Sequence, residues 1–134
     1  MTFETFTTGT NWETNAAFSQ VARVPADADL VVTAGQVAYD DDANIVGVGD
    51  IEEQTRVVFD NLDRTLQSAG ATFDDVLKLR YSVTEREYYE TVADVRGDYI
   101  SEPHPTGMLA VVDGLAEPEL LIEVEALAAV SPDK

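Results

Sequence analysis

Residues 119–130, Glu-Leu-Leu-Ile-Glu-Val-Glu-Ala-Leu-Ala-Ala-Val, alternate in hydrophobicity with a period of two. This period is typical of a β-strand whose two faces meet different surroundings. One face is entirely apolar, whereas the other places two carboxylates between leucines. The apolar face holds Leu120, Ile122, Val124, Ala126 and Ala128, and the other holds Leu121, Glu123, Glu125 and Leu127. Because carboxylates beside apolar side chains are unusual on a face left to water, Glu123 and Glu125 are the first candidates for chemistry.

The charge of the chain restricts its partners. Its 134 residues favour a single domain spanning 1–134, and 26 acidic against 8 basic residues give a formal net charge of −18. We expect no nucleic-acid partner, because such binding depends on neutralising phosphates. The only lysines are Lys78 and Lys134, although 45% of the residues are hydrophobic. This balance is typical of a protein kept soluble in high salt and predicts a haloarchaeal source. An ordinary acidic cytoplasmic protein is the alternative.

Several absences shape the remaining expectations. The sequence has no cysteine, so disulfides and thiol chemistry are excluded. No run is long and apolar enough to span a bilayer, so no membrane partner is expected. The N-terminus has no basic segment followed by an apolar one, which favours a cytoplasmic location. His104 is the sole histidine, a loop residue by its place beside Pro105, and it has no second His or Cys with which to bind a metal.

The pattern along the chain predicts strands, a helix, a strand, a second helix and two final strands. Asp50, with Glu53 three residues on, predicts a capping box that starts a helix ending at Gly70. Thr84 and Glu87 predict a second capping box, and its helix ends before Pro103 and Pro105. In the strand between the helices, Leu77, Leu79, Tyr81 and Val83 share one face, and Lys78, Arg80, Ser82 and Thr84 share the other. Strands are expected at 2–8, 18–24, 30–37, 45–48, 73–84, 106–112 and 119–130.

This order predicts an α+β fold in which both helices pack on one face of a single mixed sheet. The opposite face carries apolar Leu121 and Leu127 beside Glu123. Soluble proteins rarely leave a half-apolar sheet face in water, so we expect it to be covered by other copies of the chain.

The chain resembles the reactive intermediate deaminase family, RidA or YjgF. The resemblance rests on the order and spacing of short motifs over nearly the whole chain. They are Phe18-Ser19-Gln20, Ala34-Gly35-Gln36, Gln54-Thr55, Asn61-Leu62, Ala69-Gly70, Asp75-Val76, Pro105 and Ile122-Glu123-Val124-Glu125-Ala126. The resemblance implies a chorismate-mutase-like fold and a homotrimer with a small-molecule cleft at each subunit interface. It also implies hydrolysis of imines and enamines without metal or cofactor, by a glutamate that positions water and an arginine that binds the substrate carboxylate.

The sequence departs from the family pattern in the recognition residues. Glu123 matches the glutamate of the family, but Gly107 stands at the position of the arginine, and glycine offers no cation. Phe18 replaces the signature tyrosine, Ala34 replaces a serine, and a frequent asparagine falls on Ala93. The chain therefore looks like a divergent branch with a less polar pocket, and a neutral or apolar ligand is expected. The catalytic candidate is Glu123, and the substrate-binding candidates are Phe18, Ala34, Gly35, Arg80, Gly107 and Met108.

Alternatives remain at each position. Glu123 either orients water or pairs with Arg80, and Arg80 either supplies the missing cation or forms an interface salt bridge. Trp12 is expected to anchor a loop on the core, with ligand stacking as the other interpretation. For the whole protein, imine hydrolysis is the leading hypothesis and a non-catalytic, metabolite-binding or regulatory trimer is the alternative. Ribonuclease activity, reported for some relatives, fits poorly with the charge of −18.

Overall fold

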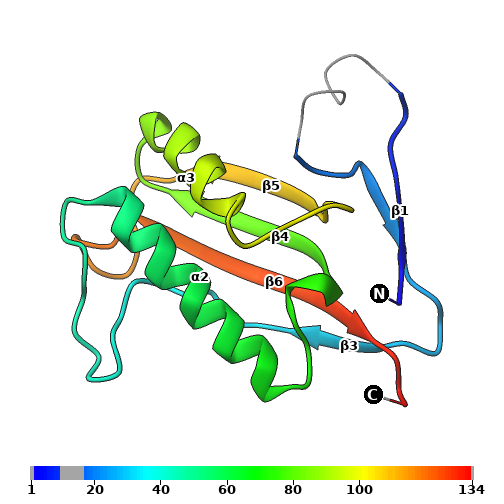
Figure 1. Cartoon of the computed structure of the whole chain (residues 1–134). Coiled ribbons are helices and arrows are strands. Elements are labelled where there is room, and N and C mark those ends of the chain that lie inside the picture. The colour runs from blue at the N-terminus through cyan, green and yellow to red at the C-terminus, as the bar shows by residue number, and fades with distance from the viewer. Residues whose placement is uncertain (1, 10–16, 134) are drawn as a thin grey trace.

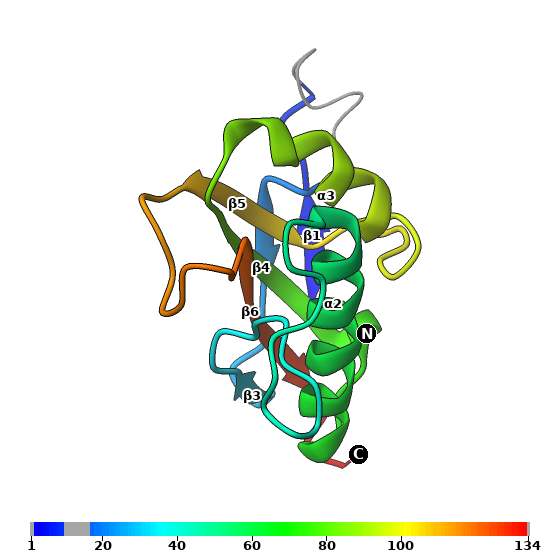
Figure 2. The ribbon, with the colours of Figure 1, turned by 90° about the vertical axis from the view of Figure 1, so that its left-hand side faces the viewer.

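A four-stranded mixed sheet with both helices on one face forms the body of the molecule, as predicted (Figures 1 and 2). The computed structural model describes residues 2–9 and 17–133, so Trp12 lies outside the described residues. The strand order is β3-β6-β4-β5, in which β6 is antiparallel to both neighbours and β4 is parallel to β5. The elements are β3 (Asp29–Val32), α2 (Ile51–Ser68), β4 (Val76–Val83), α3 (Tyr89–Arg96), β5 (Thr106–Val111) and β6 (Ile122–Val130).

The two short N-terminal strands do not join this sheet. β1 (Glu4–Phe6) pairs antiparallel with β2 (Val21–Arg23) as a separate two-stranded sheet. Phe3 beside this hairpin packs with Leu77 and Ala129 in a small second core. The expectation of one sheet was therefore wrong for these strands, which cover one end of the helix-free face of the main sheet.

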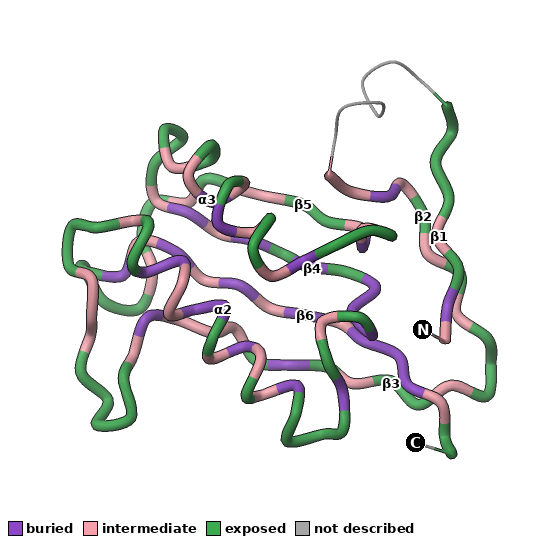
Figure 3. Tube along the Cα trace, viewed as in Figure 1, coloured by how far each residue is buried: buried purple, intermediate pink, exposed green. Residues whose placement is uncertain are grey.

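The alternation predicted for β6 is confirmed, and Figure 3 shows it along the strand. Ile122, Val124 and Ala128 are fully or almost fully buried under the helices, whereas Glu123 and Glu125 are partly exposed on the other face. The predicted face of Leu77 was wrong. A register shift between Val76 and Lys78 puts Val76 in the main core and turns Leu77 to the hairpin side.

The start and end of α2 follow the predicted signals. The Asp50 carboxylate accepts from the backbone N–H of Glu53 at 3.1 Å, and Gly70 follows the helix at φ 77°. The backbone N–H of Asp50 donates to the carbonyl of Gly47 instead of to Glu53. Gln54 is completely buried and joins the helix to the start of β6. Its amide donates to the Glu119 carbonyl at 2.8 Å and accepts from the Leu121 N–H at 2.9 Å.

Three other local predictions differ from the structure. The second capping box does not form, because a 3-10 turn, η2 (Arg86–Tyr88), precedes α3 and no side chain caps either element. Another 3-10 turn, η1 (Phe73–Asp75), occupies the start of the strand predicted at 73–84. Residues 45–48 form a single bridge, between Ile45 and Tyr39.

The main core contains a cluster of aromatic rings between the helices and the sheet. The Phe59 ring lies 5.1 Å from that of Tyr99 and 6.4 Å from that of Tyr81, centroid to centroid. Tyr81 is 4% exposed. Burial raises the pKa of its hydroxyl to about 12, although nearby Arg96 acts in the opposite direction. No helix in the described ranges is both long and apolar enough to cross a membrane.

Candidate functional site

The segment that follows β3 bulges away from regular pairing with β6. Thr33 pairs with Ala126, since its N–H donates to the Ala126 carbonyl at 3.0 Å and its hydroxyl accepts from the Ala126 N–H at 2.9 Å. Gln36, three residues on, pairs with Val124, only two residues back along β6. One extra residue therefore lies on the β3 side, and the predicted strand 30–37 is split by a bulge at Ala34 and Gly35. Such bulges re-aim side chains and are frequent beside active sites.

Gly35 lies directly against the Glu123 carboxylate. A Cβ atom built on Gly35 would overlap the Glu123 Oε2 atom and would stand 2.7 Å from its Cδ atom. The backbone at Gly35 has a negative or extended φ, so the restriction is one of space and not of conformation. The bulge thus brings a backbone without a side chain onto the carboxylate and limits where Glu123 can lie.

Four polar side chains line a hollow of about 220 Å³ on the helix-free face: Arg80, Ser82, Glu123 and Glu125. They meet there because β4 and β6 pair Arg80 with Glu125 and Ser82 with Glu123. Arg80 forms an ion pair with Glu125 at 3.7 Å, and their side chains are 56% and 46% exposed. Among the described residues, no ion pair reaches Glu123. The predicted alternative of an Arg80–Glu123 pair is therefore replaced by Arg80–Glu125, which leaves Glu123 without an ion-pair partner among the described residues.

A second hollow of about 250 Å³ adjoins the first and is partly apolar. It shares Arg80 and Glu125 and adds Lys78, Val32 and Leu127. Val32 is 75% exposed and Leu30, two residues before it on β3, is 60% exposed. This part of the helix-free face therefore combines cations with large apolar side chains that nothing in the described chain covers.

The remaining predicted residues fall into two places. Met108 pairs with Arg80 across β5 and β4, on the helix-free face. Gly107 pairs with Leu79, and a Cβ atom there would point at the Leu79 carbonyl, 3.3 Å away, and the Tyr81 ring, on the helix side. Phe18 lies near the start of β5, because the next residue, Ser19, donates to the carbonyls of His104 and Pro105.

The structure therefore brings together Gly35, Arg80 and Glu123, with Ala34 in the same bulge. It does not bring Gly107 to them in one chain. Gly107 pairs with Leu79 and Glu123 pairs with Ser82, and these two partners are three residues apart on β4, about 10 Å at the rise of a strand. Gly107 and Glu123 also lie on opposite faces of the sheet.

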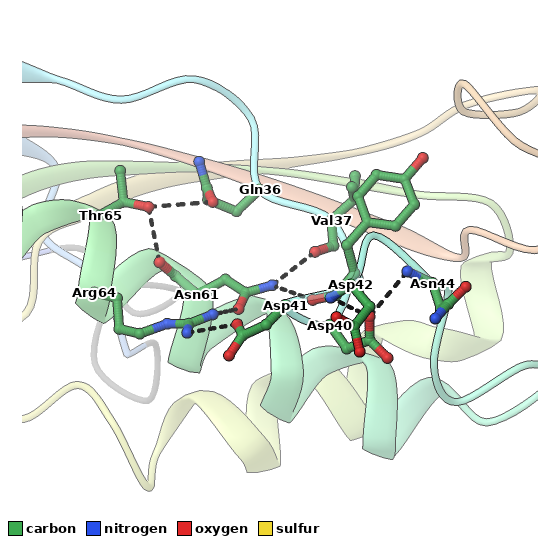
Figure 4. A network of polar contacts seen from close by, with 10 residues as sticks. Gln36, Val37, Asp40, Asp41, Asp42, Asn44, Asn61, Arg64 and Thr65 are labelled. Atoms are coloured by element: carbon green, nitrogen blue, oxygen red, sulfur yellow. Dashed lines mark hydrogen bonds and ion pairs between the residues drawn. The ribbon is translucent and has the colours of Figure 1, made fainter.

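A network of polar contacts holds the bulged segment to α2 (Figure 4). The Asn61 amide donates to the carbonyls of Val37 and Tyr39 at 3.1 and 3.0 Å. The Arg64 guanidinium donates to the Asn61 carbonyl oxygen at 2.6 Å and to Asp41 at 2.8 Å. The Thr65 hydroxyl lies 3.3 Å from the Gln36 side-chain oxygen. Sequence reasoning gave Asn61 no role at the site. The signal that could have indicated a role is a polar amide on α2 close to Leu62 and Leu66, both of which are buried.

The described residues contain no group of three or more His, Asp or Glu side chains placed to hold a metal ion. The chemistry that these residues offer is that of a carboxylate beside a hydroxyl and a paired guanidinium.

Known proteins resemble this chain along most of its length. A family model described as endoribonuclease L-PSP matches residues 8–130. A RutC family protein of Pyrococcus abyssi is 31% identical over 111 residues, which cover 83% of this chain and 84% of that protein. A crystal structure of a conserved Rid family protein of unknown function from Yersinia pestis is 30% identical, has a TM-score of 0.77, and covers 97% of this chain and 100% of its own. A YjgF family structure from Mycobacterium tuberculosis is 30% identical, has a TM-score of 0.66, and covers 96% and 99%.

Proposed function

Because this chain belongs to the endoribonuclease L-PSP family, which includes the YjgF and Rid proteins, we propose that it hydrolyses a reactive imine or enamine without a cofactor. In this proposal Glu123 positions the attacking water, in a cleft formed between copies of the chain.

One observation carries the proposal: Glu123 is the carboxylate of the hollow that no cation neutralises among the described residues, and Gly35 at a bulge packs against it. A carboxylate in that state can accept a proton from water. Glu125 is less suited to this role, because its charge is already used by Arg80 at 3.7 Å.

The reaction needs only water and one group that moves a proton. The imine nitrogen first takes up a proton from solvent. Glu123 accepts a proton from water while the oxygen bonds to the carbon of this iminium ion, which gives a neutral carbinolamine. Glu123 then returns its proton to the amine, and as the carbon–nitrogen bond breaks the hydroxyl proton passes to solvent, leaving a carbonyl compound and ammonia. An enamine enters the same route after it tautomerises to the imine. General acid–base catalysis of this kind contributes about 10²- to 10⁴-fold to a rate.

The substrate class is inferred from two positions, Gly107 and Arg80, because Lys78 lines only the adjoining hollow. Gly107 cannot bind a carboxylate, and Arg80 is bound to Glu125. Phe18 and Ala34 also bring no hydroxyl to the site. We therefore expect a neutral small imine to be preferred over a 2-imino acid. If Arg80 instead replaces the missing arginine, Arg80→Ala abolishes binding of anionic ligands and leaves the oligomer intact.

A cleft between copies is supported by the separation of the candidate residues. Gly107 and Glu123 lie on opposite faces of the sheet in one chain, so one ligand can reach both positions only if a second copy supplies one of them. Leu30, Val32 and Met108, which are 60%, 75% and 46% exposed, offer apolar area for such contacts. A homotrimer is the assembly that the family resemblance implies.

Ammonia release from imines generated in the assay tests the activity. An amine oxidase supplies neutral imines and an amino-acid oxidase supplies 2-imino acids, so one experiment compares both classes. We expect faster release with the neutral imines and a loss of about 10²- to 10⁴-fold in Glu123→Gln. Activity that survives this substitution would remove Glu123 from the mechanism.

A metabolite-binding trimer without turnover is the second candidate, favoured by the glycine at the cation position. Ligand binding with no hydrolysis of either imine class would establish it. The ribonuclease activity named in the family description is disfavoured, because a charge of −18 repels the phosphates of RNA.

A further inference from the structure

The bulged segment is held from two sides. On the sheet side, Gln36 exchanges backbone hydrogen bonds of 2.8 and 3.0 Å with Val124, and Gly35 lies on the Glu123 carboxylate. On the helix side, the carbonyls of Val37 and Tyr39 accept from the Asn61 amide (Figure 4). Between Thr33 and Gln36 the regular ladder is interrupted, so the backbone at Gly35 depends on its neighbours for its position.

The orientation of the Asn61 amide is fixed by its own partner. The Arg64 guanidinium donates to the Asn61 oxygen at 2.6 Å, which leaves the amide nitrogen facing the loop. Arg64 is held in turn by Asp41 at 2.8 Å, in the same loop. The amide therefore uses both of its hydrogens on the carbonyls of Val37 and Tyr39, which are two and four residues beyond Gly35.

We propose that Asn61 is a positioning residue for Glu123. It fixes residues 37–39, these fix Gly35 through Gln36, and Gly35 restricts the carboxylate of Glu123 to one place. This inference rests on the proposed function and names a residue, outside the hollow, on which that function depends. Without the Asn61 amide, only the hydrogen bonds of Thr33 and Gln36 to β6 hold the segment around Gly35, and Glu123 gains orientations in which it does not hold water against the substrate. Misplacement on this scale costs about 10- to 100-fold in a catalytic rate.

The test compares Asn61→Leu, which keeps the branched side-chain shape and removes both donors, with Gln67→Leu, which removes an amide from an exposed position of the same helix. We expect Asn61→Leu to lower kcat about 10- to 100-fold with KM within about twofold, and Gln67→Leu to leave both constants unchanged. An unchanged kcat in a folded Asn61→Leu protein would overturn the proposal.

A second measurement does not depend on activity. The Glu123 carboxyl ¹³C shift and the Gly35 amide shift should change in Asn61→Leu, whereas the Glu125 carboxyl shift should not. Shift changes confined to residues 37–41 would show that Asn61 only holds the loop in place, and would refute the proposal. If the wild-type protein hydrolyses no imine, the proposed function fails, and these shifts still decide whether Asn61 positions Glu123. If Asn61→Leu does not fold, Thr65→Val against Thr65→Ser gives the same comparison at the Gln36 contact of 3.3 Å.

Discussion

At Gly35 a single hydrogen atom decides whether the bulge can lie on Glu123. In Gly35→Ala the new methyl group would overlap the Glu123 carboxylate, so either the loop or the glutamate must shift. We expect kcat for imine hydrolysis to fall about 100-fold, because the carboxylate is displaced by about an ångström. The melting temperature should change little, since the bulge is at the surface.

Gly114→Ala is the matched control, because a Cβ atom there meets nothing within 4 Å. Equal kcat in the two variants would show that the contact between Gly35 and Glu123 has no part in the reaction.

Burial of Tyr81 makes the stability of the fold depend on alkaline pH. Its pKa is about 12 in the folded protein and about 10 when the chain is unfolded. Only the unfolded state ionises between these values, so the stabilisation is complete below pH 10 and is lost as pH rises towards 12. The slope is about 1.4 kcal/mol per pH unit. Urea unfolding from pH 9 to 11 should show this loss, and Tyr81→Phe should have a smaller slope; equal slopes would assign the loss to other groups.

At the scale of elements, Gln54 joins α2 to β6 with two hydrogen bonds from a buried amide. Gln54→Leu would leave the Glu119 carbonyl and the Leu121 N–H without these partners. We expect a loss of about 2 to 4 kcal/mol in the free energy of unfolding, since each unsatisfied buried group costs about 1 to 3 kcal/mol. Urea denaturation measures it, and Gln67→Leu on the exposed side of the helix should cost under about 0.5 kcal/mol. If Gln54→Leu were as stable as the wild-type protein, water would have to replace the amide as the hydrogen-bond partner of the two groups.

The elements that sequence could predict are those set by local chemistry. The period of β6, the cap at Asp50 and the glycine at 70 each depend on residues within a few positions, and all are confirmed. The face of Leu77 was wrong because the register shift at Val76 depends on pairing with β6, far along the chain.

In the candidate site, too, the sequence predicts some residues and not others. Glu123 stands out in sequence because its neighbours are apolar, and the parity of β4 already placed Arg80 and Ser82 on its face. The bulge at Gly35 and the Asn61 contacts could not be predicted. They require knowing that Gln36 pairs with Val124 and that the loop after β3 returns to α2.

For the whole molecule, the helix-free face predicts self-association. Val32 is 75% exposed on the edge strand β3 and lines the partly apolar hollow that also holds Arg80 and Glu125. Val32→Asp would put a charge into a contact between copies, so we expect the assembly to dissociate into folded monomers. Sedimentation velocity measures the change. Val48→Asp is the control, since Val48 is 66% exposed in the loop before α2 and lines neither hollow of the helix-free face. Dissociation in both variants, or in neither, would reject this face as the interface.

The net charge of −18 predicts that salt stabilises the fold. Repulsion among carboxylates weakens as the screening length falls from about 10 Å at 0.1 M to about 3 Å at 1 M. We expect the melting temperature to rise steadily from about 0.1 M to molar potassium chloride. Sucrose at matched osmolality, which cannot screen charge, separates this effect from crowding. A melting temperature independent of salt would indicate an ordinary acidic protein and not a halophilic one.

The position of β6 has a consequence for synthesis of the chain. β6 follows β3, β4 and β5 in sequence, yet it lies between β3 and β4 and is hydrogen-bonded to both. A nascent chain that has not yet released residues 122–130 from the ribosome can pair β4 with β5, but β3 has no partner in the sheet. Until residues 122–130 emerge, the apolar sides of α2 and β3 are exposed to chaperones and to aggregation. The sheet and its core can therefore form only after β6 has been synthesised.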